Sequence, residues 1–352
     1  WILSDLLPGD PLTAGSVRLQ RARISAPNGA VWESRLPAPA ISLSRGALDR
    51  KLAQAAGRAG THIREGTRVV SVSGDLESGF RLRLQTQRGT EIISARAVIG
   101  AYGRRSRLDR ELRRAFMRKS QPFMAFKAHF TGPSLEDRIE LHAFPGGYCG
   151  LSDIESGMQN VCMLVHQSAF EAANQGREPS IDHLVSWIGR QNDALGDWLR
   201  QARRVQDRWL AIAQIPFDAK APLVNDVLMA GDSAGVIVPL AGDGIAMALE
   251  SGALAGKMLA EVLQGDNSAH SIRKGYPAVW RRRYGGRLRF GRLLQPLLLS
   301  PAAANRMIPL IGAIPALGQF FLRSTRGKIT KNRLARGRPA NHVQEEQWQQ
   351  HN

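Results

Sequence analysis

Strand-like and helical patterns of apolar residues follow one another through the first 110 positions. Strands are expected at Ser16–Ile24, Ala30–Leu36, Thr67–Val72, Phe80–Gln85 and Thr90–Ser94. Between the first two, Pro27-Asn28-Gly29 is typical of a hairpin turn. Apolar residues recur at helical spacing in Gly46–Gly60, and the short run Ala97–Gly100 is typical of a buried parallel strand. This order of elements predicts an α/β fold.

From residue 121 onward the pattern changes to short strands separated by Gly, Pro and Ser. They are expected at Phe123–Phe130, Arg138–Ala143, Gly147–Ser152 and Gln159–Val165. Ile181–Leu199 has one apolar face and predicts a single helix, and Trp209–Gln214 returns as a strand. Val227–Ala230 predicts a buried strand, and a long helix follows from about Gly244 to Leu263. We therefore expect an antiparallel substrate domain interleaved with an α/β domain.

The last quarter of the chain alternates between basic and apolar residues. Its most hydrophobic part is Leu293–Leu322, which Pro296, Pro301, Pro309 and Pro315 are expected to break into shorter segments. No unbroken apolar run there reaches the roughly 20 residues that a membrane span needs. We expect a C-terminal helical region of this composition.

Composition limits the class of protein. The 352 residues suffice for two domains, and 43% of them are hydrophobic, so the chain can bury a sizeable core. Only two cysteines occur, Cys149 and Cys162, which disfavours a disulfide scaffold and predicts reduced thiols in a cytoplasmic protein. No CxxC pair is present, so we expect no metal site. The chain begins at Trp1, and no signal-peptide pattern follows it.

The formal net charge of +18 is concentrated at one end of the chain. No Asp or Glu occurs between Asn267 and Gln344, whereas Lys and Arg are frequent there. Such a segment fits an anionic membrane surface or an acidic carrier protein, and the alternative is a solvated face. It lacks the aromatic stacking platforms of single-strand binders, so nucleic acid is not expected as a partner.

The segment that carries chemistry is Val227–Gly256, VLMAGDSAGVIVPLAGDGIAMALESGALAG. Asp232 follows a buried strand, where a carboxylate can accept hydrogen bonds from a ribose hydroxyl. The small residues after it let a backbone approach a ligand closely. A helix begins near Gly244, and the N–H groups at its start favour negative charge, such as that of a reduced flavin. A strand–loop–helix unit without a ligand is the less favoured interpretation, because the pattern extends over about thirty residues.

Three blocks of the sequence resemble a known group of flavoproteins. They are Leu43–Asp49 (LSRGALD), similar to R-x-x-L-D, Ala97–Arg107 (AVIGAYGRRSR), similar to VIGADGxxSxxR, and Gly231–Gly244, similar to GDAAGxxxPxxGxG. The group includes p-hydroxybenzoate-hydroxylase-type monooxygenases and geranylgeranyl-reductase-like oxidoreductases. The resemblance covers most of residues 40–265, and its third block is specific. It implies a Rossmann-like FAD-binding domain.

The resemblance also implies FAD contacts residue by residue. They are Arg45 near the phosphates or ribose, Val69 (or Val70) at the adenine, Gly100, Ala101 and Gly103 near FAD and a reduced nicotinamide, Gly231, Asp232 and Gly235 at the ribityl or pyrophosphate region, and Pro239, Gly242, Gly244 and Ile245 around the isoalloxazine. The sequence departs from the pattern at Tyr102, where the group has Asp. It departs again at Asp109, where the group has the arginine of SxxR, with Arg110 one position further. These changes bear on the use of NAD(P)H as electron donor more than on FAD.

No catalytic residue is identified by the sequence. His129, His142 and His166 lie on strand-like segments and are interpreted as core or sheet-face residues. Pro145–Ser152 resembles a P-x-G-Y segment that faces the flavin in reductase-like members, and a plain hairpin turn is the equal alternative. The Trp-x-Trp-x-Ile-Pro segment typical of flavin halogenases does not occur, which disfavours halogenation.

The strand–GxGxxG–helix unit that opens this class of fold does not occur in the sequence. Trp1–Gly9 resembles the segment that follows that unit. We therefore expect about one further βαβ unit, roughly 50 residues, to precede this chain. Residues 1–352 by themselves should then bind FAD poorly, and a titration showing tight, stoichiometric flavin on them would contradict this.

Residues 41–110 and 210–266 are expected to form the FAD-binding domain, residues 1–40 and 111–209 the substrate domain, and residues 267–352 the basic C-terminal region. The resemblance implies an FAD-dependent oxidoreductase that reduces or hydroxylates a lipophilic small molecule. One alternative is an NAD(P)H-dependent flavin monooxygenase of aromatic rings. Another is a non-catalytic module that binds a membrane or a carrier protein. The expected location is the cytoplasm, with peripheral attachment to a membrane as the further option.

Overall fold

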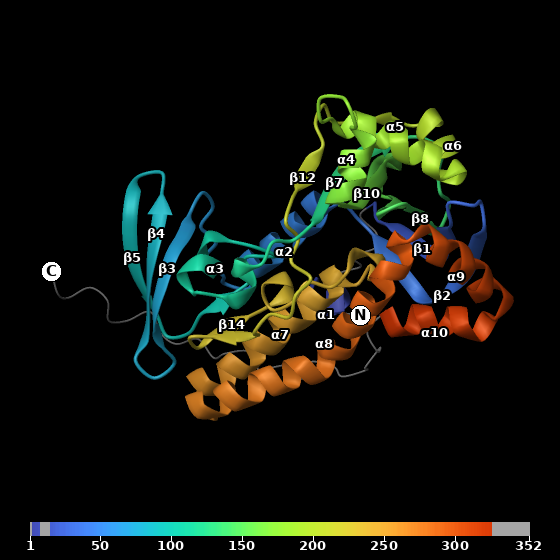
Figure 1. Ribbon diagram of the computed structural model, residues 1–352. Coiled ribbons are helices and arrows are strands. Elements are labelled where there is room, and N and C mark those ends of the chain that lie inside the picture. The colour runs from blue at the N-terminus through green and yellow to red at the C-terminus, as the bar shows by residue number, and fades with distance from the viewer. Residues whose placement is uncertain (1, 8–14, 326–352) are drawn as a thin grey trace.

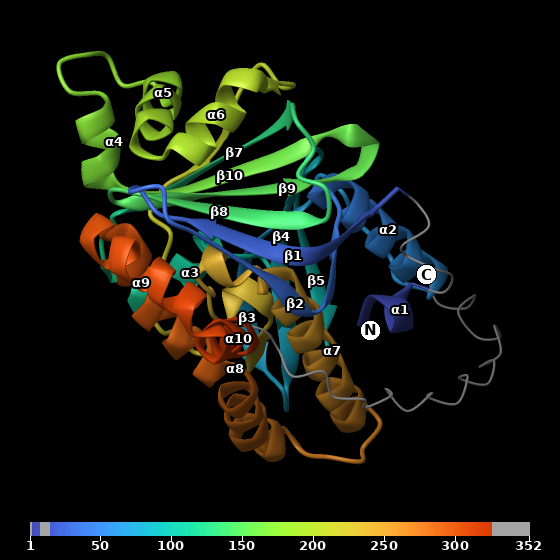
Figure 2. The same cartoon turned by 90° about the vertical axis from the view of Figure 1, so that its right-hand side faces the viewer.

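An eight-stranded sheet forms the centre of the part of the chain that the computed structural model describes, residues 2–7 and 15–325. Its order is β11-β7-β10-β9-β8-β1-β2, with β12 also pairing with β7 (Figure 2). The strands are β1 (Val17–Ser25), β2 (Val31–Ser42), β7 (Phe123–Thr131), β8 (Arg138–Phe144), β9 (Gly147–Asp153), β10 (Gln159–His166), β11 (Arg203–Arg204) and β12 (Leu210–Ile212). All neighbours are antiparallel except β1 and β8, which are parallel. The predicted antiparallel sheet is therefore present.

Helices cover both faces of this sheet (Figures 1 and 2). On one face lie α4 (Gln167–Ala173), α5 (Ile181–Gln191) and α6 (Asp193–Gln201). On the other face lie α9 (Pro301–Ala313), α10 (Pro315–Thr325) and the end of α8 (Ala269–Leu299). Alternation along each strand feeds both layers: Phe126 of β7 enters the first core, whereas its neighbour Ala125 enters the second.

Asn192 divides the helix that the sequence predicts as one piece over Ile181–Leu199, and that prediction is wrong. The Asn192 side chain caps α6 by accepting a hydrogen bond from Leu195 N at 3.2 Å. The same side chain donates to the Ala143 carbonyl of β8 at 3.0 Å. Because this residue is 1% exposed, the contacts to the sheet override the helical pattern.

Ser25, His142 and Glu140 lie beside Asn192 and have the residue types of a hydrolytic triad. Ser25 Oγ is 2.7 Å from His142 Nδ1, and His142 Nε2 is 3.1 Å from Glu140 Oε2. Ser25 and His142 are each 1% exposed, so no substrate can reach the hydroxyl. The group joins β1 to β8 within the core, in line with the interpretation of His142 as a core residue.

Two smaller sheets form the second part of the molecule. β6 (Ile99–Gly100) runs parallel to β14 (Val227–Met229), which pairs antiparallel with β13 (Leu223–Val224). β3 (Arg68–Asp75), β4 (Gly79–Thr86) and β5 (Gly89–Ala95) form an antiparallel meander that projects at the left of Figure 1. The helices of this part are α1 (Ile2–Leu6), α2 (Arg45–Arg58), α3 (Arg107–Glu111) and α7 (Gly244–Leu263). The run Ala97–Gly100 was predicted as a buried strand, and it is only partly buried. Ile99 is 38% exposed because β6 is an edge strand among the described residues.

The helix α8 connects the two parts. Ile272, Tyr276, Trp280 and Tyr284 near its start pack into the core around β14 and α7, whereas Leu298 near its end packs against the large sheet. Figure 1 shows this helix running along the lower edge of the molecule beneath both parts. It passes through Pro277 and Pro296, and α9 contains Pro309, so the expectation that each proline ends a segment is wrong. Among the prolines of Leu293–Leu322, Pro301 and Pro315 stand at helix starts as expected, where a missing N–H costs no hydrogen bond.

Part of the basic C-terminal region neutralises acids elsewhere in the fold. Arg273 binds Asp226 and Glu77, and the Arg273 Nε–Asp226 Oδ1 distance is 2.9 Å. Arg326 and the basic residues after it lie outside the described residues. Among the described helices, none alone is long and apolar enough to cross a membrane; α9 and α10, bent by 112°, pass that test only as a pair.

Candidate functional site

Two of the sequence blocks meet at the carboxyl ends of neighbouring parallel strands. β6 leads into Gly100–Arg104 and β14 leads into Gly231–Gly235, and Ala230 N donates to the Gly100 carbonyl at 3.1 Å. Ser233 ties the segments together, since its Oγ accepts from Gly103 N at 2.9 Å and donates to Gly103 O at 3.1 Å. The end of a parallel sheet, where successive loops diverge, is where open α/β folds bind ligands. The fold therefore brings together six of the twelve residues to which FAD contacts were assigned.

Arg114 also links these segments through hydrogen bonds, and it was not identified from the sequence. Its Nη1 donates to Asp109 Oδ1 at 2.9 Å and to Ser233 O at 2.8 Å, and its Nη2 donates to Ala221 O at 2.9 Å. Tyr102 Oη donates to the same Asp109 oxygen at 2.9 Å. The Arg114 side chain is 2% exposed and that of Asp109 is 0% exposed.

The departures at Tyr102 and Asp109 are thereby explained. An arginine is present, but at position 114 instead of within the SxxR motif, and it pairs with the aspartate that replaces the motif's arginine. Asp109 also accepts from Ser106 N at 2.7 Å and forms a capping box at the start of α3. No spacing rule within the block would have located Arg114.

Lys220 is a second buried cation at the site. Its Nζ donates to the carbonyls of Arg104 at 2.5 Å and Asp232 at 2.9 Å, one from each segment. It also lies 4.3 Å from the ring centroid of Phe116. Burial lowers the pKa of Lys220 to about 8, and the charge of Arg114 acts in the same direction.

This pKa predicts a pH effect on stability. Between pH 8 and the ordinary lysine pKa of 10.5, the folded protein binds fewer protons at Lys220 than the unfolded chain does. Stability therefore increases with pH in this window, by about 1 kcal/mol from pH 8 to pH 9 for this group. Urea unfolding at pH 8 and pH 9 measures this increase. The increase in the free energy of unfolding should be larger in the wild type than in Lys220→Met by that amount. Equal changes in the two proteins would contradict the assignment.

Asp232 has a partly exposed carboxylate in the second of the two joined segments. Its carboxylate is 33% exposed and lies 3.9 Å from Arg104 Nε. Burial raises the pKa of Asp232, while the charges of Arg104, Lys220 and Arg45 oppose this. The carboxylate suits ribose hydroxyls, and the three surrounding cations suit phosphate oxygens, so the chemistry of the residues fits FAD.

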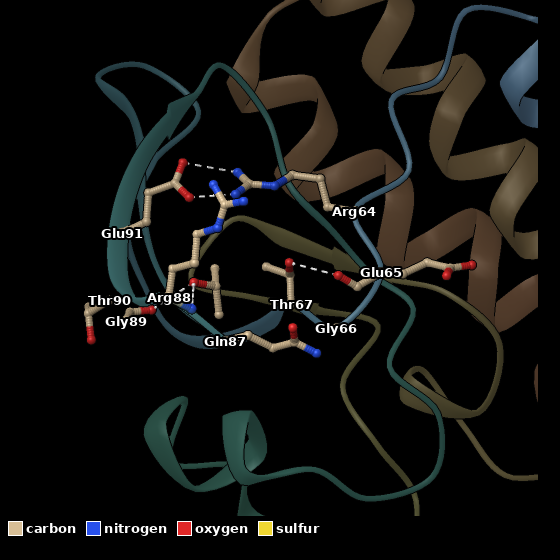
Figure 3. Close-up of a pocket in the computed structure, with 10 residues that line it drawn as sticks. Arg64, Glu65, Gly66, Thr67, Gln87, Arg88, Gly89, Thr90 and Glu91 are labelled. Carbon is tan, nitrogen blue, oxygen red and sulfur yellow. Dashed lines mark hydrogen bonds and ion pairs between the residues drawn. The ribbon is translucent and has the colours of Figure 1, made fainter.

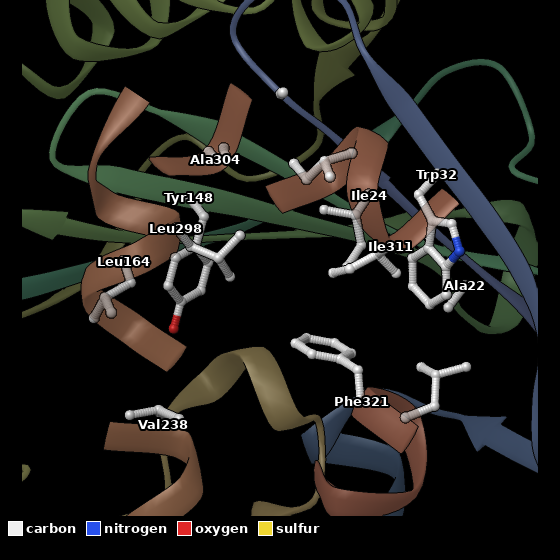
Figure 4. Packing of buried hydrophobic residues seen from close by; sticks show 14 of the residues in the cluster. Ala22, Ile24, Trp32, Tyr148, Leu164, Val238, Leu298, Ala304, Ile311 and Phe321 are labelled. Carbon is white, nitrogen blue, oxygen red and sulfur yellow. The ribbon is translucent and has the colours of Figure 1, made fainter. Parts of the chain in front are cut away.

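The segment assigned to the isoalloxazine lies against the large sheet. Pro239–Ala241 forms a short 3₁₀ helix, Gly242 has φ +62°, and α7 begins at Gly244. Leu240 N donates to the hydroxyl of Tyr148 at 3.2 Å, and Tyr148 is 2% exposed. Figure 4 shows this hydroxyl pointing from the sheet toward the segment that carries Val238. The Tyr148 segment is thus a hairpin turn and also a neighbour of the predicted flavin loop.

The remaining predicted residues have mixed surroundings. Packing alone explains why glycine stands at positions 231 and 235. A Cβ at Gly231 would lie 2.9 Å from Ala248, and a Cβ at Gly235 would lie 2.8 Å from Trp280. Ala101 is exposed, and Ile245 is 40% exposed.

Arg45 and Val69 come from other elements. Arg45 opens α2 and binds Asp49 at 3.0 Å, while its charge acts on Asp232. Val69 adjoins a bulge in β3 that leaves Val70 outside the ladder, so the Val70 backbone can serve a ligand. No described contact joins Val69 to the two segments, and its role remains a prediction.

A separate hollow of about 640 Å³ lies on the β3–β5 meander (Figure 3). Arg64, Thr67, Arg88 and Glu91 line it, and Arg64 Nη1 donates to Glu91 Oε1 at 3.0 Å. None of the residues assigned to FAD lines this hollow.

The family follows from comparison with known proteins. Residues 33–276 match the model of the family described as FAD binding domain, so the chain belongs to that family. Digeranylgeranylglycerophospholipid reductase 2 of Methanopyrus kandleri is 23% identical over 278 residues, which is 77% of this chain and 67% of that protein. Menaquinone reductase of Mycobacterium tuberculosis is 26% identical over 316 residues, 86% of this chain and 72% of that protein.

Solved structures agree on the fold. A geranylgeranyl bacteriochlorophyll reductase-like protein from Thermoplasma acidophilum has a TM-score of 0.69 at 18% identity, covering 84% of this chain and 75% of its own. A myxobacterial chondrochloren halogenase has a TM-score of 0.71 at 19% identity, covering 92% and 82%. The fold is thus that of FAD-dependent oxidoreductases. The chain spans 67%, 59% and 66% of the length of three archaeal reductases that it matches.

Proposed function

We propose that the protein is an FAD-dependent oxidoreductase that reduces a lipophilic small molecule. The observation that carries this proposal is the joining of Gly100–Arg104 and Gly231–Gly235 at the ends of β6 and β14, beneath the Tyr148 face of the large sheet. The relatives named above as reductases of digeranylgeranylglycerophospholipid and of menaquinone favour reduction and a lipid-like substrate.

The chain's own residues would bind and shield the cofactor, and FAD would supply the hydride chemistry. Asp232 would accept hydrogen bonds from the ribityl or ribose hydroxyls, and Arg45 and Arg104 would face the pyrophosphate. The start of α7 would stabilise negative charge on the reduced ring. Tyr148, which is buried, would keep water from one side of the loop that holds the ring.

Oxygen use separates reduction from aromatic hydroxylation. With NAD(P)H as donor, a monooxygenase consumes oxygen in step with substrate, whereas a reductase saturates a double bond under anaerobic conditions. We expect the full-length protein to oxidise its reduced flavin with a polyprenyl substrate in the absence of oxygen. Turnover that requires oxygen and an aromatic substrate would favour the monooxygenase instead.

We further propose that the protein docks on an anionic membrane through α8–α10. Five of the fourteen large hydrophobic residues that are exposed within the described chain lie on or directly after these helices: Leu293 (72% exposed), Leu297 (39%), Leu310 (51%), Ile314 (46%) and Phe320 (59%). Phe290 of α8 and Phe320 of α10 pack edge to face, with their ring centroids 6.0 Å apart. Exposed arginines on these helices include Arg289, Arg292, Arg306 and Arg323, in addition to Arg281, Arg282 and Arg283 nearer the start of α8. Apolar side chains flanked by arginines, without acids, fit an anionic lipid surface.

Vesicle sedimentation tests this docking surface. We expect the wild type to pellet with vesicles containing anionic lipid at low salt, and the double variant Leu293→Glu with Phe320→Glu to bind at least tenfold more weakly, since each change removes apolar burial and adds repulsion. Leu210→Glu is the matched control, because Leu210 is 69% exposed on β12 of the large sheet. Absence of wild-type binding at low salt would end the proposal, and equal loss in the control would remove the assignment to α8–α10.

A further inference from the structure

Asp243 stands at the start of α7 but does not cap the helix with its side chain. It lies between Gly242 and Gly244, at the N-cap position of the helix that is assigned to the isoalloxazine, and it is 9% exposed. An aspartate at an N-cap normally accepts hydrogen bonds from the first N–H groups of the helix. Here the side chain makes no such cap bond. The carboxylate therefore does not occupy the N–H groups that a flavin would need.

An arginine from the C-terminal region binds this carboxylate instead. Arg287 of α8 binds Asp243 Oδ2 through Nη1, and its Nη2 donates to Glu250 Oε2 at 3.2 Å. Glu250 lies two turns further along α7. All three side chains are 11–12% exposed, so water screens their charges little. Arg287 also stacks over Tyr284, with 5.1 Å from its guanidinium carbon to the ring centroid.

Arg287 lies eleven positions beyond residue 276, where the match to the family model ends. The basic C-terminal region thus reaches the segment that the family motif assigns to the flavin ring. The contact between Arg287 and Asp243 is thus one link between the motif and the C-terminal region.

We propose that Arg287 is a positioning residue of the flavin site, an inference that rests on the proposed function. It holds the Asp243 carboxylate away from the first turn of α7 and offsets part of its charge, since the same guanidinium also binds Glu250. The helix start then remains able to stabilise the anionic reduced flavin. Without Arg287, the carboxylate loses this contact and its negative charge beside the ring is less balanced. Reduced FAD should lose affinity more than oxidised FAD does.

The midpoint potential of the bound flavin measures this difference without any turnover. In the full-length protein we expect Arg287→Gln to weaken binding of reduced relative to oxidised FAD at least tenfold, a negative shift of about 30 mV for two electrons. The double variant Asp243→Asn with Arg287→Gln removes the charge along with its partner, so it should recover most of the shift. Arg282→Gln, on an exposed neighbouring position of α8, serves as the matched control and should leave the potential unchanged.

The outcomes separate the two proposals. A wild type that binds no flavin would overturn the proposed function itself. Bound flavin whose potential is unchanged in Arg287→Gln would leave the proposed function standing and overturn the role of Arg287. If Arg287→Gln alone does not fold, the double variant decides between the outcomes. A midpoint potential near that of the wild type supports charge balance. A midpoint potential that is about 30 mV more negative than that of the wild type contradicts it.

Discussion

Replacing Arg114 by methionine should lower the free energy of unfolding by about 3–5 kcal/mol. The change leaves the Asp109 carboxylate, which is 0% exposed, without its cationic partner. It also removes donors to Ser233 O and Ala221 O, so the segments after β6 and β14 lose their common support. Urea unfolding of the protein without flavin measures the loss, and FAD binding should be lost with it.

Two further variants identify the cause. Arg110→Met removes an exposed arginine of α3 and should change stability by less than about 0.5 kcal/mol. Adding Asp109→Asn to Arg114→Met removes the isolated buried charge and should restore part of the stability. A double variant as unstable as Arg114→Met would show that the unpaired carboxylate is not the main cost.

Replacing Asp232 by alanine should weaken FAD binding about tenfold to 100-fold with little effect on stability. A hydrogen bond from a hydroxyl to a charged carboxylate contributes about 1.5–3 kcal/mol, which sets this range. Lys220 binds the backbone carbonyl of Asp232, so the support of the loop survives the substitution. Isothermal titration with FAD measures the affinity, and urea unfolding without flavin checks the fold.

The matched control is an aspartate of similar exposure in the turn directly before β8 of the large sheet. Asp137 is 29% exposed, against 33% for Asp232, and binds Arg21 at 2.5 Å. Asp137→Ala should leave FAD affinity unchanged. If both variants lose affinity equally, the effect would be one of general stability and Asp232 would have no contact with the cofactor.

The local pattern of apolar and polar residues was sufficient to predict elements whose structure depends on their own segment of the chain. Strands β7 to β10 were predictable because each alternates between the core under α4–α6 and the core under α8–α10. The start of α7 at Gly244 was also predictable, because glycine and proline mark the turn before it.

What could not be predicted depends on pairs of residues far apart in the chain. The break at Asn192 comes from its bond to Ala143 of β8, 49 positions earlier. Arg287 reaches Asp243 across 44 positions, and Arg114 reaches Ser233 across 119. No periodicity or motif spacing records such contacts. The resemblance supplied the site assignments, and the fold then showed which buried cations hold the assigned segments together.

The most direct test of FAD bound along Gly100–Arg104, Gly231–Gly235 and the start of α7 is one flavin titration. It is carried out on the full-length protein and on Asp232→Ala in parallel, followed by the absorbance and fluorescence of the bound flavin. We predict one FAD per wild-type chain and an affinity that falls at least tenfold in the variant. A folded wild type that binds no FAD, or a variant that binds it equally well, would contradict this account of the site.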